Sequence, residues 1–185
     1  MEELLRRARR FRDAGYAAHA DLYRRLAGRQ APHTLFIACA DARVDPALLV
    51  GAAPGELFVV RNVANAVPPW APGDDRAHER AAIEFAVVEL DVERIVVLGH
   101  SNCGGCAALA EPGAIDEALP NLRAWAAATE AEGATSTEAF ERANVKRQLA
   151  NLRTYPCVAE REAAGTLAVS GWYLRIGTGE IFECD

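Results

Sequence analysis

Two short segments of the sequence carry residue types that could hold a metal ion. Cys39 follows the apolar run Leu35–Ala38, and His100 and Cys103 follow a second apolar run, Ile95–Leu98. Two thiolates and one imidazole suit Zn²⁺, and three protein ligands leave a fourth tetrahedral position open, as in catalytic zinc sites. Each residue taken singly is more often structural than a ligand. Together, at the ends of neighbouring strands, they predict one Zn²⁺ per chain.

A possible ion pair lies two residues beyond the first of these positions. Asp41 and Arg43 would project from the same face of an extended segment and could pair. A carboxylate held by arginine stays ionised and acts only as a hydrogen-bond acceptor. Beside a zinc-bound hydroxide, it would hold the hydroxyl hydrogen and aim the oxygen lone pair at a substrate. The competing interpretation is a surface ion pair that contributes little.

The turn that contains Cys103 has further features. Gly104 and Gly105 follow it and allow the backbone to pass close to a metal. A helix that begins there would help to hold Cys103 as a thiolate. Cys103 and Cys106 also form a C-x-x-C at a helix start, the arrangement of thiol–disulfide oxidoreductases. That alternative explains neither Cys39 nor His100.

The hydrophobic pattern predicts the elements that position these residues. Short continuous apolar runs at 35–38, 57–60 and 95–98 suit strands that are buried on both faces of a parallel sheet. A helix from about Ala77 to Leu90, capped by Asp74 or Asp75, would make the crossover between the last two strands. Because loops at the carboxyl ends of parallel strands form sites, the candidate ligands should meet at one edge.

The C-terminal half predicts further helices and two strands. An Ala-rich helix follows Gly105, and a more polar helical segment runs from about Asp116 to Leu152 with a loop around Gly133. A strand over 167–176 turns at 177–179 into a short strand over 180–184. The fold class is therefore α/β: a single domain over 1–185 with a mostly parallel central sheet flanked by helices and an antiparallel edge strand at the C-terminus.

The N-terminal segment and the composition set the remaining limits. Residues 1–28 form an amphipathic, Arg-rich helical arm with a break near Gly15, which we expect to pack on a partner subunit. The net charge of −6 argues against nucleic-acid binding. Neither a signal peptide nor a membrane-spanning stretch is visible. We therefore expect a cytoplasmic protein whose five cysteines are thiols, ligands or catalytic groups.

These residues resemble a family signature. Cys39-x-Asp41-x-Arg43 followed by His100-x-x-Cys103 resembles the zinc-site pattern of the β-class carbonic anhydrases. The similarity extends in order along most of the chain from about Gln30. Its further landmarks are the segments 54–65 and 82–87, Asn144-Val145, Asn151-Leu152 and Gly171-Trp172.

The resemblance implies an activity, a pocket and an assembly. The activity is zinc-dependent, reversible hydration of carbon dioxide to bicarbonate and a proton, by attack of a zinc-bound hydroxide that the Asp41–Arg43 pair orients. The assembly is a homodimer or a larger homo-oligomer. In an inactive state, Asp41 would become a fourth zinc ligand. The residues that fall where the family lines its substrate pocket are Gln30, Phe58, Val63, Phe85 and Gly104.

Two further alternatives keep the zinc but change the function. Relatives of this family hydrolyse carbonyl sulfide or carbon disulfide by the same attack, and pocket shape decides between these substrates and carbon dioxide. The second alternative is a binding or regulatory protein whose zinc is purely structural, closed permanently by Asp41. Arg43 argues against that closure, because it offers Asp41 a stable position away from the metal.

Overall fold

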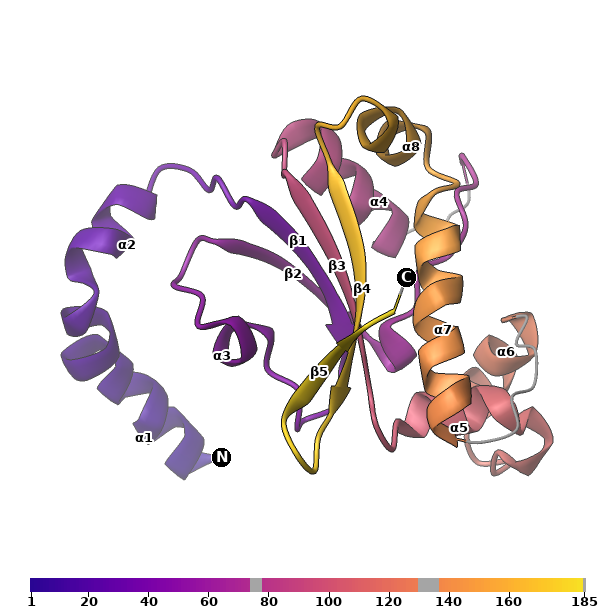
Figure 1. Cartoon of the computed structure of the whole chain (residues 1–185). Helices are drawn as coiled ribbons and strands as arrows, with labels where there is room; N and C mark the ends of the chain where they lie inside the picture. Colours follow the sequence, from indigo (N-terminus) through magenta and orange to yellow (C-terminus); the bar gives the residue numbers. More distant parts are fainter. Residues whose placement is uncertain (74–77, 130–136, 185) are drawn as a thin grey trace.

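Five strands form one sheet in the computed structural model, which describes residues 1–73, 78–129 and 137–184. The strand order is β2-β1-β3-β4-β5. The first four strands run parallel, and β5 pairs antiparallel with β4 (Figure 1). The predicted mostly parallel sheet with an antiparallel C-terminal edge strand is confirmed. The strands are β1 (Thr34–Cys39), β2 (Leu57–Asn62), β3 (Arg94–His100), β4 (Ala168–Arg175) and β5 (Glu180–Glu183).

The central strands are apolar on both faces because both faces are covered. Leu35 and Ile37 of β1 belong to the larger core cluster, which includes Ile83 and Val145 from the helices. Phe36 alternates with them and packs on the opposite face. Burial on both sides explains why these strands appear in the sequence as continuous apolar runs instead of alternating patterns.

Helices cover the two faces unequally. Figure 1 shows α7 and α8 along one side of the sheet, with α5 and α6 near its carboxyl edge and the short α3 on the other side. The helices of the body are α3 (Pro46–Val50), α4 (His78–Glu84), α5 (Gly104–Ala110), α6 (Pro120–Ala128), α7 (Thr137–Leu152) and α8 (Pro156–Ala163).

The predicted crossover helix is present as α4 followed by the π-helical turn Phe85–Glu89. The predicted long polar segment is divided into α6 and α7. The proposed caps Asp74 and Asp75 and the loop around Gly133 lie outside the described residues.

Helix α7 packs unusually close to the sheet, at two glycines. A Cβ on Gly99 of β3 would lie 2.4 Å from Val145 Cγ2, and a Cβ on Gly171 of β4 would lie 2.7 Å from Val145 Cγ1 and 2.8 Å from Leu149 Cδ1. Distances this short are not tolerated between carbon atoms, so only glycine allows the approach. The close contact fixes the depth of α7 relative to β3, whose last residue is His100.

Two short helices were not predicted, although the sequence carries their signals. α3 begins after Asp45, whose side chain accepts a hydrogen bond from the Leu48 N–H at 3.1 Å, and it ends at Gly51 with a φ of 64°. α8 begins with Pro156 in the first helical turn. An Asp-Pro start and a glycine stop are recognised helix boundaries, so both helices were readable from local sequence.

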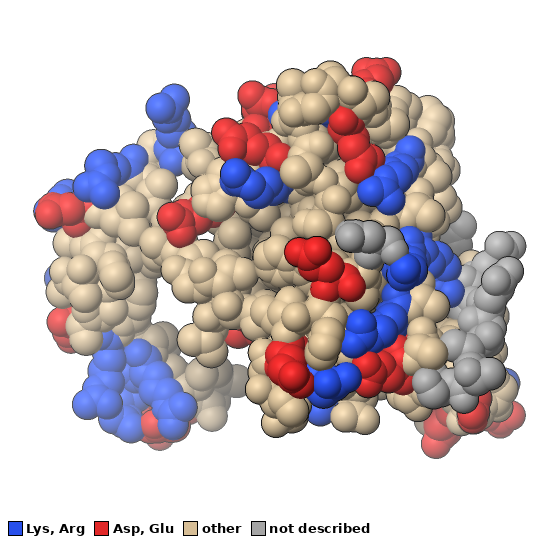
Figure 2. Space-filling view, viewed as in Figure 1, with Lys and Arg blue, Asp and Glu red and all other residues tan. Residues whose placement is uncertain are grey.

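The predicted helical arm stands apart from the body (Figure 1). It consists of α1 (Glu2–Arg10), the π-helical segment Phe11–Tyr16 and α2 (Ala20–Leu26). The chain leaves the helical path just before α2, at His19, and not at Gly15 as predicted. These three helical segments have no buried residue, and Figure 2 shows open space between the arm and the rest of the molecule.

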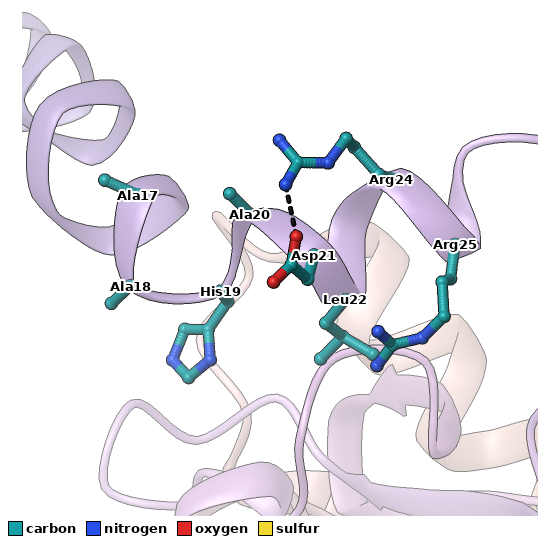
Figure 3. Close-up of a pocket in the computed structure, with 8 residues that line it drawn as sticks. All are labelled: Ala17, Ala18, His19, Ala20, Asp21, Leu22, Arg24 and Arg25. Atoms are coloured by element: carbon teal, nitrogen blue, oxygen red, sulfur yellow. Dashed lines mark hydrogen bonds and ion pairs between the residues drawn. The ribbon is translucent and has the colours of Figure 1, made fainter.

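An open hollow of about 450 Å³ lies along the arm between residues 17 and 25. The side chains of His19, Leu22 and Arg25 line this hollow and project from the arm toward the body (Figure 3). Among the residues that the structure describes, no helix combines the length and apolar character that crossing a bilayer requires.

Candidate metal centre

The carboxyl ends of β1 and β3 bring three candidate ligands together. Cys39 is the last residue of β1, His100 is the last residue of β3, and Cys103 precedes the first turn of α5. A tight turn, in which Asn102 has a φ of 54°, joins the last two. All three side chains are buried, and their candidate ligand atoms lie within 4.8 Å of one another. The sulfur atoms of Cys39 and Cys103 are 3.9 Å apart.

The imidazole of His100 is oriented with one nitrogen toward this cluster. Its Nδ1 lies 3.0 Å from the carbonyl oxygen of Ser101. Because a carbonyl oxygen only accepts, Nδ1 carries the proton and Nε2 presents a lone pair. Nε2 is buried and has no hydrogen-bond partner among the described residues. A buried acceptor without a partner is costly, so this atom fits a metal ion bound between it and the two sulfurs.

Both thiols need a nearby cation to ionise. A hydrogen bond with Cys103 and burial raise the pKa of Cys39 to about 12. A hydrogen bond with Cys106 and burial raise the pKa of Cys103 to about 11, so the start of α5 by itself does not hold it as a thiolate. Metal coordination deprotonates such thiols outright. A raised pKa is the opposite of what a thiol–disulfide oxidoreductase requires of its nucleophile.

Asp41 and Arg43 form the predicted pair beside the cluster, but through a turn and not along an extended strand. Arg43 Nε and Nη2 donate to the two carboxylate oxygens of Asp41 at 2.9 and 2.7 Å, and the backbone N–H of Arg43 donates to Oδ1 at 2.9 Å. These hydrogen bonds hold the pKa of Asp41 well below its usual range. Asp41 Oδ2 lies 3.9 Å from His100 Nε2, so an ionised acceptor borders the candidate metal position.

Arginines from two elements connect the loops that carry these residues. Arg61 of β2 donates to the carbonyl oxygens of Cys39 at 3.1 Å and Asp41 at 2.7 Å. Arg43 also donates to the carbonyl oxygen of Asn102 at 3.0 Å, which joins the first loop to the second. Arg61 is a site residue that was not predicted from the sequence. A cation within the apolar segment 57–62 was the available signal.

A buried carboxylate on α7, which was not predicted from the sequence, also reaches the site. Glu141 Oε1 accepts a hydrogen bond from the backbone N–H of Cys103 at 2.9 Å. The residue is only 2% exposed. A charged residue on the face of α7 that buries Asn144, Val145 and Gln148 was the sequence signal.

The predicted pocket residues fall into two groups. Val63 lies beside Gly105, next to Gly104 and the metal cluster. Phe58 and Phe85 contact each other with ring centroids 5.9 Å apart, but Phe58 pairs with Leu35, four residues before Cys39. That separation is about 13 Å along a strand.

Gln30 lies farther away still. It precedes the amino end of β1, whereas Cys39 lies at the carboxyl end. Three residues after it, the His33 backbone hydrogen-bonds to Glu56, Glu93 and Arg94, which all lie at the amino ends of the sheet strands. One chain therefore does not bring Gln30, Phe58 and Phe85 to its own metal cluster, because the length of the strands separates them.

Comparisons with known proteins agree with this fold. The sequence profile of the carbonic anhydrase family matches residues 34–181. A carbonic anhydrase of Pseudomonas aeruginosa is 43% identical over 95% of this chain and 84% of its own length.

Two solved structures share the fold. The β-carbonic anhydrase CcaA superposes with a TM-score of 0.91 at 36% identity, covering 99% of this chain and 86% of that one. One of two tetrameric β-carbonic anhydrases from the ascomycete Sordaria macrospora superposes with a TM-score of 0.76 at 34% identity, covering 98% and 96%. The Cys-His-Cys cluster, the sheet that positions it and these similarities together show that the chain is an enzyme of the β-carbonic anhydrase family.

Proposed function

We propose that this chain catalyses the zinc-dependent, reversible hydration of carbon dioxide to bicarbonate and a proton. Cys39, His100 and Cys103 would hold one Zn²⁺ per chain. The observation that carries the proposal is the buried, unpartnered Nε2 of His100 beside two sulfur atoms. When bound there, zinc supplies a Lewis acid that makes hydroxide available from water near neutral pH.

Asp41 and Arg43 would orient the attacking nucleophile. The ionised Asp41 would accept the hydroxyl hydrogen of the nucleophile, so that an oxygen lone pair would face carbon dioxide. Arg43 keeps Asp41 ionised and in place through two side-chain hydrogen bonds. The same bonds hold Asp41 away from the metal, which supports an open site over one that Asp41 closes as a fourth ligand.

The substrate pocket would be completed by a second copy of the chain. Val63 and Gly104 lie beside the metal cluster of their own chain, whereas Phe58, Phe85 and Gln30 do not. β2 is an edge strand of the described sheet, and Val59 and Phe85 near it are 42% and 43% exposed. A homodimer or larger homo-oligomer that packs on β2 and on the arm would cover these residues. The tetrameric relatives from Sordaria macrospora support such an assembly.

The cysteines support a reducing compartment, and we propose the cytoplasm. In the described part of the chain all five are thiols that form no disulfide, and two of them are candidate zinc ligands. Oxidising surroundings would favour disulfide formation between neighbouring thiols and so compete with metal binding.

The test is stopped-flow hydration of carbon dioxide on metal-analysed protein, with carbonyl sulfide assayed on the same preparation. We expect about one zinc per chain, fast hydration and little hydrolysis of carbonyl sulfide. Zinc at that level with faster turnover of carbonyl sulfide would change the substrate but keep the site. Zinc with neither activity would show a structural metal.

A further inference from the structure

Glu141 occupies an unusual position for a carboxylate, in the interior between α7, β4 and the start of α5. Its two oxygens accept from different elements. Oε1 accepts from the backbone N–H of Cys103 at 2.9 Å, and Oε2 accepts from the hydroxyl of Tyr173 at 2.7 Å. Because both oxygens accept, the ionised carboxylate satisfies the geometry, and both bonds are charge-assisted.

Burial of this carboxylate costs folding free energy, and packing of the fold does not by itself require a charge here. Glu141 is 2% exposed, and a buried charge destabilises a protein unless hydrogen bonds compensate for its lost hydration. An apolar residue would avoid this cost but would leave the Tyr173 hydroxyl and the Cys103 N–H without this acceptor. Of the two donors that Glu141 accepts from, the Cys103 N–H is the one that belongs to a candidate ligand, and it precedes the first turn of α5.

Rigid packing holds Glu141 at this depth. Gly99 and Gly171 let Val145, one helical turn beyond Glu141, approach the sheet directly. Tyr173 pairs in register with Gly99, next to the ligand His100, and the guanidinium of Arg142 stacks 4.6 Å from the Tyr173 ring centroid. The carboxylate is therefore fixed both by its own helix and by the strand beside the metal cluster.

We propose that Glu141 is a positioning residue for the metal centre. It fixes the peptide plane of Cys103, and this plane sets the direction in which the Cys103 sulfur points toward Cys39 and His100. Tyr173 orients the carboxylate in turn. Hydrogen bonds that orient metal ligands in this way contribute strongly to metal affinity. This inference rests on the proposed zinc site.

The experiment measures the zinc dissociation constant of the full-length protein by competition with a chromogenic chelator. The variants are Glu141→Ala, Glu141→Gln and Tyr173→Phe. The matched control is Leu149→Ala, a core truncation on the same helix that touches Gly171 and none of the candidate ligands. Cobalt-substituted protein provides a second readout, because thiolate-to-cobalt absorption reports on the geometry of the sulfur ligands.

We expect Glu141→Ala to weaken zinc binding by about tenfold or more and to change the cobalt–thiolate absorption band. The loss of such orienting groups typically lowers metal affinity by about 10- to 100-fold. Glu141→Gln keeps the shape and one acceptor but loses the charge, so it should weaken binding by about threefold or more. Tyr173→Phe should have a smaller effect than Glu141→Ala. Leu149→Ala should lower thermal stability while its zinc affinity stays within about twofold of wild type.

The proposal is overturned if Glu141→Gln binds zinc within about twofold of wild type, or if Leu149→Ala weakens binding as much as the Glu141 variants. The first result would show that the charge is irrelevant to the metal, and the second that any loss of stability has the same effect. Should Glu141→Ala fail to fold, the isosteric Glu141→Gln still decides the question. A wild-type protein that binds no zinc would refute the proposed function itself, a separate result.

Discussion

The sulfur atoms of Cys39 and Cys103 lie 3.9 Å apart although 64 positions separate the two residues in the sequence. They meet because β1 and β3 are adjacent parallel strands, with Ala38 paired to Leu98, so the loops after both strands leave the same edge of the sheet. His100 completes the group from the end of β3.

Removal of the metal should destabilise the protein. His100 Nε2 would remain buried without a partner, and the two thiols would lose the cation that keeps them ionised. Dialysis against a chelator should lower the melting temperature by several degrees, about the effect of losing 1–3 kcal/mol, and added zinc should restore it. Cys39→Ser should reduce zinc to well below one per chain. A melting temperature unchanged by chelation would argue against a metal here.

Asp41→Asn should strongly reduce hydration without removing zinc. The amide keeps the size of the side chain but loses the ionised acceptor that Arg43 maintains. We expect kcat to fall by about 100-fold or more, the usual effect of removing one preorganised electrostatic group. Metal analysis provides the control, since zinc content should match wild type. Zinc loss in this variant would instead indicate that Asp41 is a ligand.

The pH dependence should not report on Asp41. The Arg43 hydrogen bonds lower its pKa, so the carboxylate stays ionised as pH falls past the ordinary value of about 3.9 and becomes protonated only in stronger acid. If the wild-type kcat falls between about pH 9 and 6, the pH profile should therefore keep the same shape in Arg43→Lys, which weakens the pair. If the acidic side of the kcat profile moves to higher pH in Arg43→Lys, the titration would belong to Asp41.

Cys106→Ser should separate the enzyme from the thiol–disulfide alternative. Cys106 is buried beside Cys103 but is not one of the three clustered ligands. We expect hydration within about threefold of wild type, because a buried Cys-to-Ser change mainly perturbs local packing. Disulfide reductase activity that is present in wild type and lost in this variant would revive the alternative.

A charge on the exposed edge of the sheet should disrupt the assembly. Val59 on β2 is 42% exposed, so Val59→Lys should leave the fold of one chain intact while opposing contact along this edge. Light scattering should show smaller particles, and hydration should fall by about tenfold or more while zinc is retained, because the pocket would lose residues from the second copy. The control is Val88→Lys, since Val88 is 68% exposed. Full activity in a monomer would refute a shared pocket.

Gly99→Ala should destabilise the protein through one identifiable contact. The added methyl would lie 2.4 Å from Val145 Cγ2, so α7 must shift or the side chain must move. We expect a loss of about 1–3 kcal/mol in the free energy of unfolding measured with urea. The double variant Gly99→Ala/Val145→Ala should cost less than the sum of the two single changes, because it removes the clash. Additive losses would show that the close approach is not the cause.

The local sequence determined much of this protein. Apolar runs identified the strands, and cysteine and histidine at the ends of two of them identified the candidate ligands, because strand burial and ligand chemistry depend on residues within a few positions. The Asp41–Arg43 pair was visible for the same reason, although a turn and not an extended strand makes it. The helices α3 and α8 were equally local and were overlooked.

Only the tertiary structure decided how distant elements meet. The depth of α7 against Gly99 and Gly171 places Glu141 on Cys103, and no periodicity in the sequence specifies that depth. The lengths of β1 and β2 put Gln30, Phe58 and Phe85 away from the metal cluster of the same chain, although their positions in the sequence suggested a single pocket. Such relations depend on register and packing between segments far apart in the chain, where the contribution of each residue depends on its partner.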